Sequence, residues 1–257
     1  MAPAPHCCKQ EPLSMRPFMD PTETLIALHI HEEEIRAKSL AEIYHRPALR
    51  DHWTIVSEAM KLINAFASEH QHQGDDELTL QFLGIRLFNA AAASIKLALS
   101  GYYQKAFDQV RDVLETGFLV DYLVTYPHKI AEWKAADKKA RQKHFGAGII
   151  RNALDKRDGY TSGARKAIYD LISEAASHAS YRGFALMANS ENHGEVGPFF
   201  DEKKLGSWLV ELAKRFPHAA LHVNSGPGGT DLKLLAAREH YLDAVNAWRG
   251  KYLVSRN

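Results

Sequence analysis

The sequence predicts an all-α protein, a helical bundle built around a central antiparallel helical hairpin. Apolar residues recur at three- and four-residue steps through most of the 257-residue chain, which is the spacing of one face of a helix. No alternation of strands with helices, no internal repeat and no sustained heptad pattern accompanies them. Hydrophobic residues make up 46% of the chain and charged residues 25%, a composition typical of globular proteins with a substantial core.

The chain divides into a tail and one helical domain. Residues 1–19 are proline-rich and aperiodic, so we expect a disordered N-terminal tail. Residues 20–257 are expected to form a single helical domain. Its core is predicted in 75–215, with peripheral helices in 20–70 and 230–254.

The first helix is predicted to begin at "DPTE". Asp20 can cap it, Pro21 suits the first helical position, and Glu23 completes a capping box. The helix ends near Tyr44, before Pro47. A second helix carries apolar residues at helical spacing, namely Trp53, Val56, Met60, Ile63 and Phe66.

The central hairpin is predicted from residues 75–126, which contain no proline. The stretch "LQFLGIRLFNAAAASIKLALS" is apolar almost all round, as expected of a helix at the centre of a bundle. Gly101 allows a tight break, and the following helix has an apolar face that includes Gly117. The alanine run 90–93 and Gly117 permit close helix approach, so we expect two antiparallel neighbours.

The second half of the chain is predicted to alternate helices with glycine-rich breaks. Residues 128–145 indicate one solvated helix, and 164–180 indicate another. The segment 182–200 holds three glycines and a proline, so we expect one long irregular loop. Two further helices, 201–222 and 230–254, are separated by "NSGPGGT", and Pro217 is expected to interrupt the first of them.

Charge and cysteine usage exclude several classes of protein. The formal net charge of +1 gives no bulk signature of nucleic-acid or membrane binding, although a local basic patch remains open. Cys7 and Cys8 are the only cysteines, which rules out a disulfide framework. The N-terminus lacks the apolar region of a secretory signal, and no apolar run reaches about 18 residues. We expect a cytoplasmic protein without membrane contact. Acylation of the cysteine pair is the alternative, but supporting basic or apolar flanks are absent.

Arg111 and Glu115 form the first candidate pair for a site. They are four residues apart and share one helix face, at the point where a surface helix becomes a buried one. One interpretation is a simple intrahelical ion pair. The other is a partly desolvated pair that positions another group.

His178 is the second candidate. On the helix 164–180 it falls at the margin of the apolar face, so its side chain is predicted to point inward. An inward histidine is most often a hydrogen-bonded core residue. With an orienting partner it can instead act as a general base. Arg182 follows one turn later, and an arginine and a histidine near a helix end can bind phosphate.

Patterns for metals and cofactors are weak throughout the chain. "HIH" (29–31) and "HQH" (70–72) place histidines two apart, and on a helix such residues point in different directions. No HExxH motif is present. "SGPGGT" (225–230) lacks the lysine of a P-loop and is expected to be an interhelical turn. We therefore predict neither a metal nor a cofactor.

The order of motifs resembles an uncharacterised group of bacterial all-helical proteins that is distantly similar to the HEPN superfamily. The likeness spans roughly residues 75–215. It rests on "AFDQVRDVLE" (106–115), Trp133, "YDLISEAASH" (169–178) and the loop from Arg182. The resemblance implies a helical bundle that dimerises. The residues that it carries over as a site are Arg111, Glu115, Tyr169, Ser173 and His178.

Catalytic HEPN proteins cleave RNA without a metal, through an arginine and a histidine in an R-x(4–6)-H motif that meet across the dimer. Arg46 and His52 in "RPALRDH" match this spacing, but Pro47 breaks the helix that would carry them. We therefore expect a non-enzymatic, homodimeric interaction module with a protein partner, of the kind found in a stress or phage-defence system. The alternative is a metal-independent HEPN-type endoribonuclease that uses His178 with Arg111 or Arg182.

Overall fold

The computed structural model describes residues 21–177, 180–189, 193–225 and 231–253. The predicted tail 1–19 lies outside these residues. The all-α prediction is confirmed, because the described residues form helices and their one β-pairing is an isolated bridge between Ala188 and Gly194. The elements are α1 (Pro21–His45), α2 (Pro47–Asn64), η1 (Ala65–Glu69), α3 (Asp75–Leu99), α4 (Tyr103–Thr125), α5 (Lys129–Ala135), α6 (Lys138–Phe145), α7 (Ala147–Asp158), α8 (Ala164–Ile172), η2 (Ser173–Ser177), α9 (Tyr181–Phe184), α10 (Glu202–Asn224) and α11 (Leu232–Tyr252).

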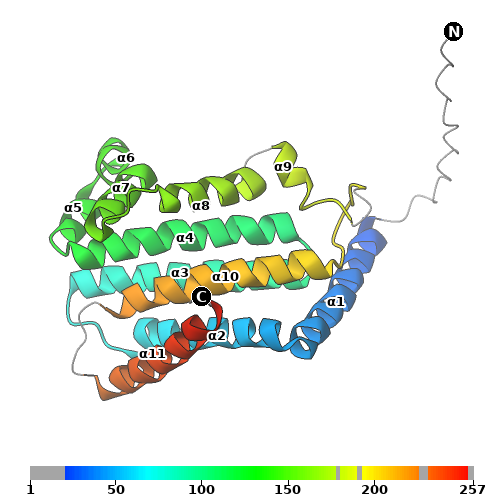
Figure 1. Cartoon of the computed structure of the whole chain (residues 1–257), viewed down its shortest axis with the longest axis horizontal. Coiled ribbons are helices and arrows are strands. Elements are labelled where there is room, and N and C mark those ends of the chain that lie inside the picture. The colour runs from blue at the N-terminus through cyan, green and yellow to red at the C-terminus, as the bar shows by residue number, and fades with distance from the viewer. Residues whose placement is uncertain (1–20, 178–179, 190–192, 226–230, 254–257) are drawn as a thin grey trace, which may run out of the picture.

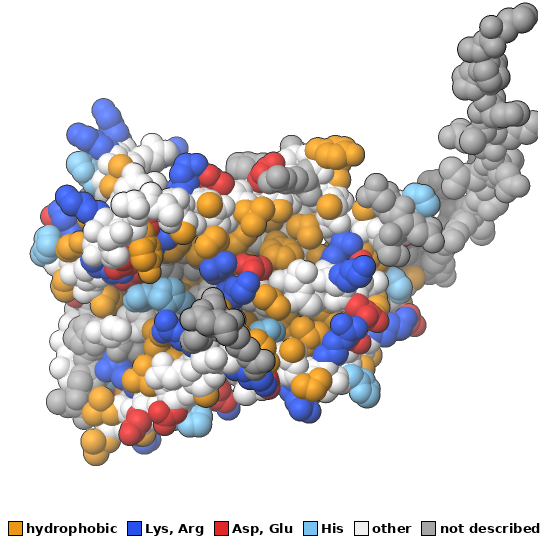
Figure 2. Space-filling model, in the orientation of Figure 1, with side chains coloured by type: hydrophobic (Ala, Val, Ile, Leu, Met, Phe, Trp, Pro, Cys, Tyr) orange, Lys and Arg blue, Asp and Glu red, His pale blue; other side chains and the backbone are white. Residues whose placement is uncertain are grey.

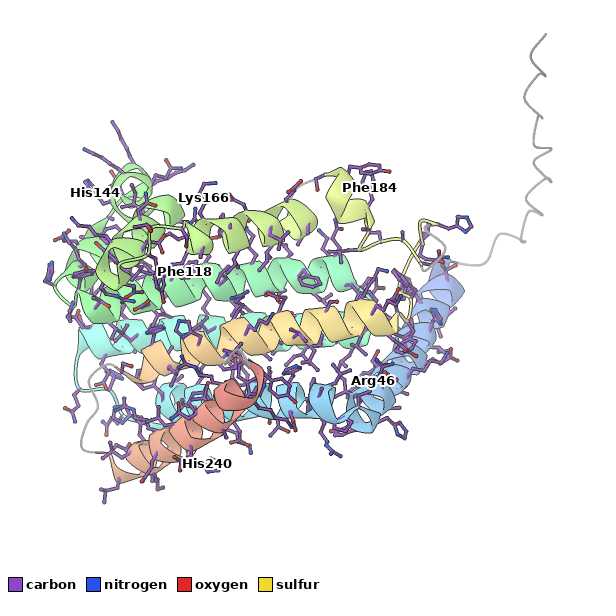
Figure 3. All side chains as sticks on the ribbon, viewed as in Figure 1. Arg46, Phe118, His144, Lys166, Phe184 and His240 are labelled. Atoms are coloured by element: carbon purple, nitrogen blue, oxygen red, sulfur yellow. The ribbon has the colours of Figure 1, made fainter. Side chains whose placement is uncertain are left out.

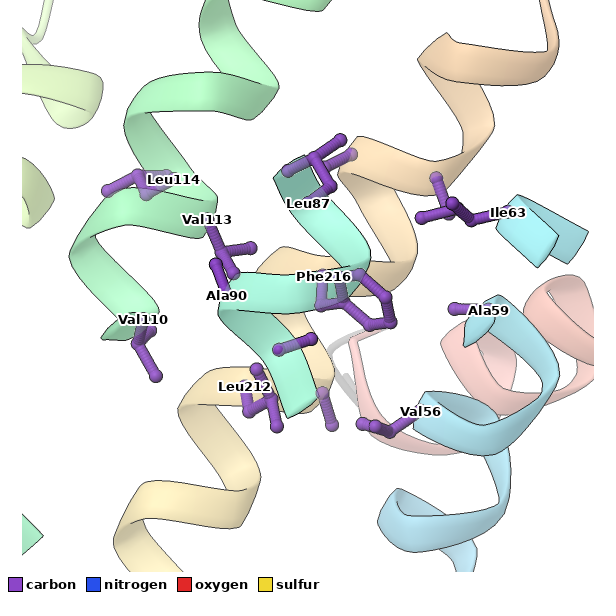
Figure 4. Close-up of a cluster of buried hydrophobic side chains, with 14 of the residues drawn as sticks. Val56, Ala59, Ile63, Leu87, Ala90, Val110, Val113, Leu114, Leu212 and Phe216 are labelled. Carbon is purple, nitrogen blue, oxygen red and sulfur yellow. The ribbon is translucent and has the colours of Figure 1, made fainter. Parts of the chain in front are cut away.

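Four of the long helices, α2, α3, α4 and α10, run side by side and enclose the core (Figure 1). Each contributes apolar residues at helical spacing to one continuous cluster. Figure 4 shows part of it, with Ile63 from α2, Leu87 from α3, Val113 from α4 and Phe216 from α10 facing one another. The bundle is therefore built on the predicted α3–α4 hairpin, with α10 packed along both of its helices.

Two glycines make this packing possible. Gly101 lies at the predicted break, whereas Gly117, expected to bring the two hairpin helices together, faces α10 instead. A Cβ on Gly117 would lie 2.8 Å from the Cβ of Ala219, so α4 and α10 approach as closely as their backbones allow. Gly101 has φ of 86° and a Cβ there would lie 2.5 Å from the Phe199 carbonyl oxygen. Only glycine suits that break between α3 and α4.

A buried polar link fixes the register of three core helices. Trp208 Nε1 on α10 donates to Ser94 Oγ on α3 at 2.8 Å, and Ser94 Oγ donates to the Ala106 carbonyl on α4 at 2.8 Å. Each of the three polar groups in this link is hydrogen-bonded, so the link orients the helices without leaving any of them unpaired in the core.

Helix α3 is long and apolar enough to cross a membrane by length and composition. Its buried residues, including Leu80, Leu87 and Ala91, pack inside the bundle. The position of α3 between α4 and α10 accounts for its apolar character.

A buried histidine ties α11 to the rest of the bundle. His70, directly after η1, makes two hydrogen bonds, from Nε2 to Glu77 Oε1 at 2.8 Å and from Nδ1 to Asp231 Oδ2 at 2.9 Å. The side chains of His70 and Glu77 are each only 3% exposed. Asp231 also caps α11 by accepting from the Lys233 and Leu234 amides. We call His70, Glu77 and Asp231 the clasp.

Three sequence predictions in the second half of the chain are corrected. The single helix expected over 128–145 is two helices, because the chain turns at Ala136 and Asp137 caps α6 through the Ala140 amide. Helix α7 was not predicted, since Gly146 and Gly148 indicated a break. Pro217 does not interrupt a helix, because α10 continues through it to Asn224.

Candidate functional site

Arg111 is the centre of a hydrogen-bond network that joins α4 to α8 and η2. Its Nε donates to Ser173 Oγ at 3.0 Å, and its Nη2 donates to the Tyr169 hydroxyl at 2.6 Å. Glu115 Oε2 lies 3.4 Å from Nη2, one helical turn along α4. The structure therefore brings together four of the residues named from the sequence. We call Arg111, Glu115, Tyr169 and Ser173 the Arg111 network.

The network keeps Arg111 charged although it is partly buried. Burial works against the charged form, but the hydrogen bond to Tyr169 and the nearby Glu115 raise the pKa of Arg111 above its ordinary value. Tyr169 also faces a second cation, because the Arg151 guanidinium lies 4.0 Å from the centre of its ring and that of Arg111 lies 5.2 Å from it.

The remaining predicted site residues cannot be joined to this network. His178 lies outside the described residues, and so does the side chain of Arg182, whose backbone belongs to α9. Ser173 opens the π-helix η2, which replaces the expected regular helix up to residue 180. Single π-turns within helices frequently occur at functional sites.

Beside the Arg111 network lies a cavity of about 590 Å³, enclosed by α3, α4, α5, α6 and α7. This volume is in the range of small-molecule sites. Apolar side chains form much of its wall, including Phe118, which Figure 3 marks on α4. The charged groups that line it are Arg86, Arg111, Asp112, Glu115 and Arg141, and Trp133 lies beside them. We call it the arginine cavity.

A second cleft, of about 220 Å³, lies between α4, α8 and α10. Its floor holds a chain of contacts between titratable side chains. Asp121 Oδ1 on α4 lies 3.4 Å from His222 Nδ1 on α10, and His222 Nε2 lies 3.4 Å from His218 Nε2. Phe118 contributes to both this cleft and the arginine cavity, which are thus separated by α4. We call it the histidine cleft.

Asp121 is held in place by an arginine from the end of α7. Its side chain is 5% exposed, and Arg157 donates to its two oxygens at 2.5 and 3.1 Å. Such a bidentate contact fixes the orientation of the carboxylate. Asp121 in turn is placed to orient the imidazole of His222, as a carboxylate does for a catalytic histidine.

Both histidines of the cleft are neutral at pH 7. Burial lowers the pKa of His222, and the Asp121 charge offsets only part of this effect. His218 is exposed to solvent at the cleft, yet desolvation by the protein around it and the neighbouring His222 lower its pKa to about 4. Neutral imidazoles next to each other can accept or pass a proton.

Basic side chains surround the two histidines. Arg165 from α8 and Lys214 and Arg215 from α10 line the cleft together with Tyr160. The Nε of Arg215 is buried and has no hydrogen-bond partner among the described residues. Figure 2 shows further Lys and Arg side chains at the end of the molecule formed by α5, α6 and α7. They include four exposed residues of α6, which are Lys138, Lys139, Arg141 and Lys143.

Sequence reasoning missed this cleft, although one signal was available. Arg215 and His222 are seven residues apart in "RFPHAALH" and match the R-x(4–6)-H spacing with six residues between them. Pro217 concealed the match because it indicated a helix break. Residues three, four and seven apart share a helix face, and the intact α10 therefore places Arg215, His218 and His222 along one cleft.

The match that was found, Arg46 to His52, forms no site. Arg46 lies in the break between α1 and α2 and pairs with Glu42 and with Glu202, the latter at 2.5 Å (Figure 3). His52 is buried, and its Nδ1 accepts from Trp248 Nε1 at 3.0 Å. The two residues have different partners, so Pro47 separates them as expected.

The histidine pairs of "HIH" and "HQH" also have separate surroundings. His29 and His31 contact Glu32 and Glu34 respectively, whereas His70 belongs to the clasp. Within the part of the chain that the structure describes, no group of three or more His, Cys, Asp or Glu side chains is arranged to hold a metal ion.

Comparisons with protein-family models, with curated proteins and with solved structures gave no match to this chain.

Proposed function

We propose that the protein is a metal-independent endoribonuclease whose reaction takes place in the histidine cleft. The observation that carries this proposal is the contact chain Asp121–His222–His218, beside the Arg215 guanidinium and in an open cleft. It differs from the ribonuclease alternative drawn from the sequence, which used His178, and assigns the catalytic role to His218 and His222. The R-x(4–6)-H spacing of Arg215 and His222 supports the same assignment.

The reaction in this proposal is transfer within the RNA strand. A neutral histidine takes the proton of a ribose 2′-hydroxyl, whose oxygen then forms a bond to the adjacent phosphorus. The bond from phosphorus to the 5′-oxygen breaks, and that oxygen receives a proton. The products are a 2′,3′-cyclic phosphate and a 5′-hydroxyl. Arg215, Lys214 and Arg165 stabilise the charge on the phosphoryl oxygens.

One feature of the cleft and one of the surface outside it suit a phosphodiester. A bound phosphate anion raises the pKa of both imidazoles toward neutrality, where proton transfer is most efficient. The exposed lysines and arginine of α6 lie at the end of the bundle where α4 and α10 finish (Figure 1). They provide the local basic surface that the net charge of +1 conceals.

The test is cleavage of mixed single-stranded RNA in EDTA. We expect the wild type to release products with cyclic phosphate ends, and His222→Ala to cut at least about 100-fold more slowly. His240→Ala is the matched control, because His240 is exposed and contacts Glu58 away from the cleft. A His178→Ala variant tests the sequence-based alternative. Wild-type protein that does not cleave, or a His222→Ala variant that cleaves normally, would overturn the proposal.

A second candidate function is a homodimeric interaction module, and one observation favours it. Near the start of α1 the side chains of Leu25, Ile26 and Ile30 are 55–58% exposed on a helix that leaves the bundle (Figure 1). Such apolar surface is typical of a contact with a second chain. Light scattering after gel filtration tests it. A dimer that becomes a monomer in an Ile26→Glu, Ile30→Glu double variant supports this function, and a monomeric wild type contradicts it.

A further inference from the structure

The arginine cavity has a surplus of positive charge. Arg86, Arg111 and Arg141 line it, against the two carboxylates of Asp112 and Glu115. Arg86 pairs with Asp112 at 2.5 Å and Arg111 lies 3.4 Å from Glu115, so each acid faces its own arginine. Arg141 donates from Nη2 to the Ala136 carbonyl at 3.0 Å. That bond uses one of its five N–H donors.

A buried cation behind the cavity adds to this surplus. Arg151 follows the lining residue Ile150 on α7 and is only 8% exposed. Its Nη1 has no hydrogen-bond partner among the described residues, and none of the described carboxylates forms an ion pair with it. The ring of Tyr169 compensates part of the charge. A buried guanidinium without a carboxylate nonetheless favours an anion nearby.

The charge and the walls together indicate the chemistry of a ligand. Three lining arginines face two lining carboxylates, which leaves a surplus of one positive charge, and the buried Arg151 adds a further cation behind the wall. A phosphate monoester carries about −1.5 to −2 at pH 7, so this positive surplus favours its binding. The Trp133 ring and the apolar side chains of Phe118 and Phe145 line the same space. They suit a flat aromatic group attached to that phosphate.

We propose that the arginine cavity binds a nucleoside monophosphate. Arg111 and Arg141 hold the phosphate, the charge of Arg151 behind Arg111 strengthens the attraction, and the base packs on Trp133. The cavity lies across α4 from the histidine cleft and needs none of its residues except Phe118. Nucleotide binding in this cavity can therefore be tested independently of RNA cleavage. Arg111 also connects the bound phosphate to η2 through Ser173.

Isothermal titration calorimetry of the full chain tests this site. The four nucleoside 5′-monophosphates are the probes, with the matching nucleosides and inorganic phosphate for comparison. We expect saturable binding of at least one monophosphate, tighter than that of its nucleoside or of phosphate. Arg141→Gln should weaken it about tenfold, which corresponds to 1.4 kcal/mol. Arg141 is exposed, so this variant should fold normally.

Arg36→Gln is the matched control, since Arg36 is an exposed arginine on α1 that pairs with Glu33. Its affinity should equal that of the wild type. Trp133→Leu, checked for folding by its thermal melt, should also bind more weakly. The proposal is overturned if no monophosphate saturates the protein at about 1 mM. It is also overturned if phosphate alone binds as tightly as the nucleotide, or if Arg141→Gln binds normally.

Discussion

The clasp and the histidine cleft both contain histidines next to carboxylates, yet their environments are opposite. His70 is sealed between Glu77 and Asp231. Burial alone would lower its pKa, but the hydrogen bonds to the two acids outweigh burial and raise it. His222 contacts one carboxylate, and burial keeps its pKa low. Two acids favour the charged form of a structural histidine, whereas one acid and an open cleft favour a neutral imidazole suited to proton transfer.

The largest expected effect is on the clasp. His70→Gln leaves Glu77 buried without its positive partner, so the free energy of unfolding should fall by about 3 kcal/mol. Urea denaturation at about pH 6 measures this change. RNA cleavage per folded molecule should stay at the wild-type level, because the clasp lies outside the cleft. An unchanged free energy of unfolding would mean that His70 and Glu77 do not form an ion pair in solution.

A smaller loss of stability is expected at Asp121. Asp121→Asn weakens the contact with Arg157, which keeps Asp158 as a second partner at 2.7 Å. The free energy of unfolding should therefore fall by about 2 kcal/mol. Cleavage should fall about tenfold or more, since His222 loses its orienting carboxylate. Asp51→Asn, which weakens the contact of α2 with Lys251 on α11 away from the cleft, is the control. Equal rates for the two variants would contradict the special role of Asp121.

The smallest expected effect is a difference in the pH dependence of stability. The raised pKa of His70 means that its stabilisation is complete below 6.5 and is lost as the pH rises through the folded value. The pKa of His218 is lowered to about 4, so the unfolded chain binds a proton first and stability falls as the pH drops below 6.5. The two histidines therefore contribute slopes of opposite sign.

Urea unfolding of His70→Gln and His218→Gln at about pH 5, 7 and 9 measures these slopes. Relative to the wild type, His70→Gln should lose the most stability at the lowest pH, where His70 is fully charged in the wild type. His218→Gln should gain stability relative to the wild type at that pH. Slopes of the same sign in both variants would remove the distinction between the two clusters.

Much of the fold could be predicted because the sequence patterns that indicate it are local. The α3–α4 hairpin follows from apolar spacing, the absence of proline and the glycine at 101. The break at Ala136 carries neither glycine nor proline, so it left no such signal. Gly148 lies inside α7 and Pro217 inside α10, because tertiary packing stabilises these helices against their local preferences.

The Arg111 network and the histidine cleft also differ in how local their sequence signals are. Arg111 and Glu115 are one turn apart, and a resemblance inferred from the sequence motifs added Tyr169, Ser173 and His178 as expected site residues. The first four are in contact, and His178 lies outside the described residues. The pairing of Asp121 with His222 joins α4 to α10 and depends on the close approach at Gly117. No spacing within a single helix predicts such a pair.

The clasp also has a consequence for how the chain is assembled. His70 and Asp231 are 161 residues apart, and the other end of α11 is tied to α2 by a bond that spans 196 residues, from Trp248 to His52. Closing such long loops costs entropy that only an already folded bundle offsets. During synthesis His70 and Glu77 therefore lack the contact with Asp231 until α10 is in place and the start of α11 has left the ribosome.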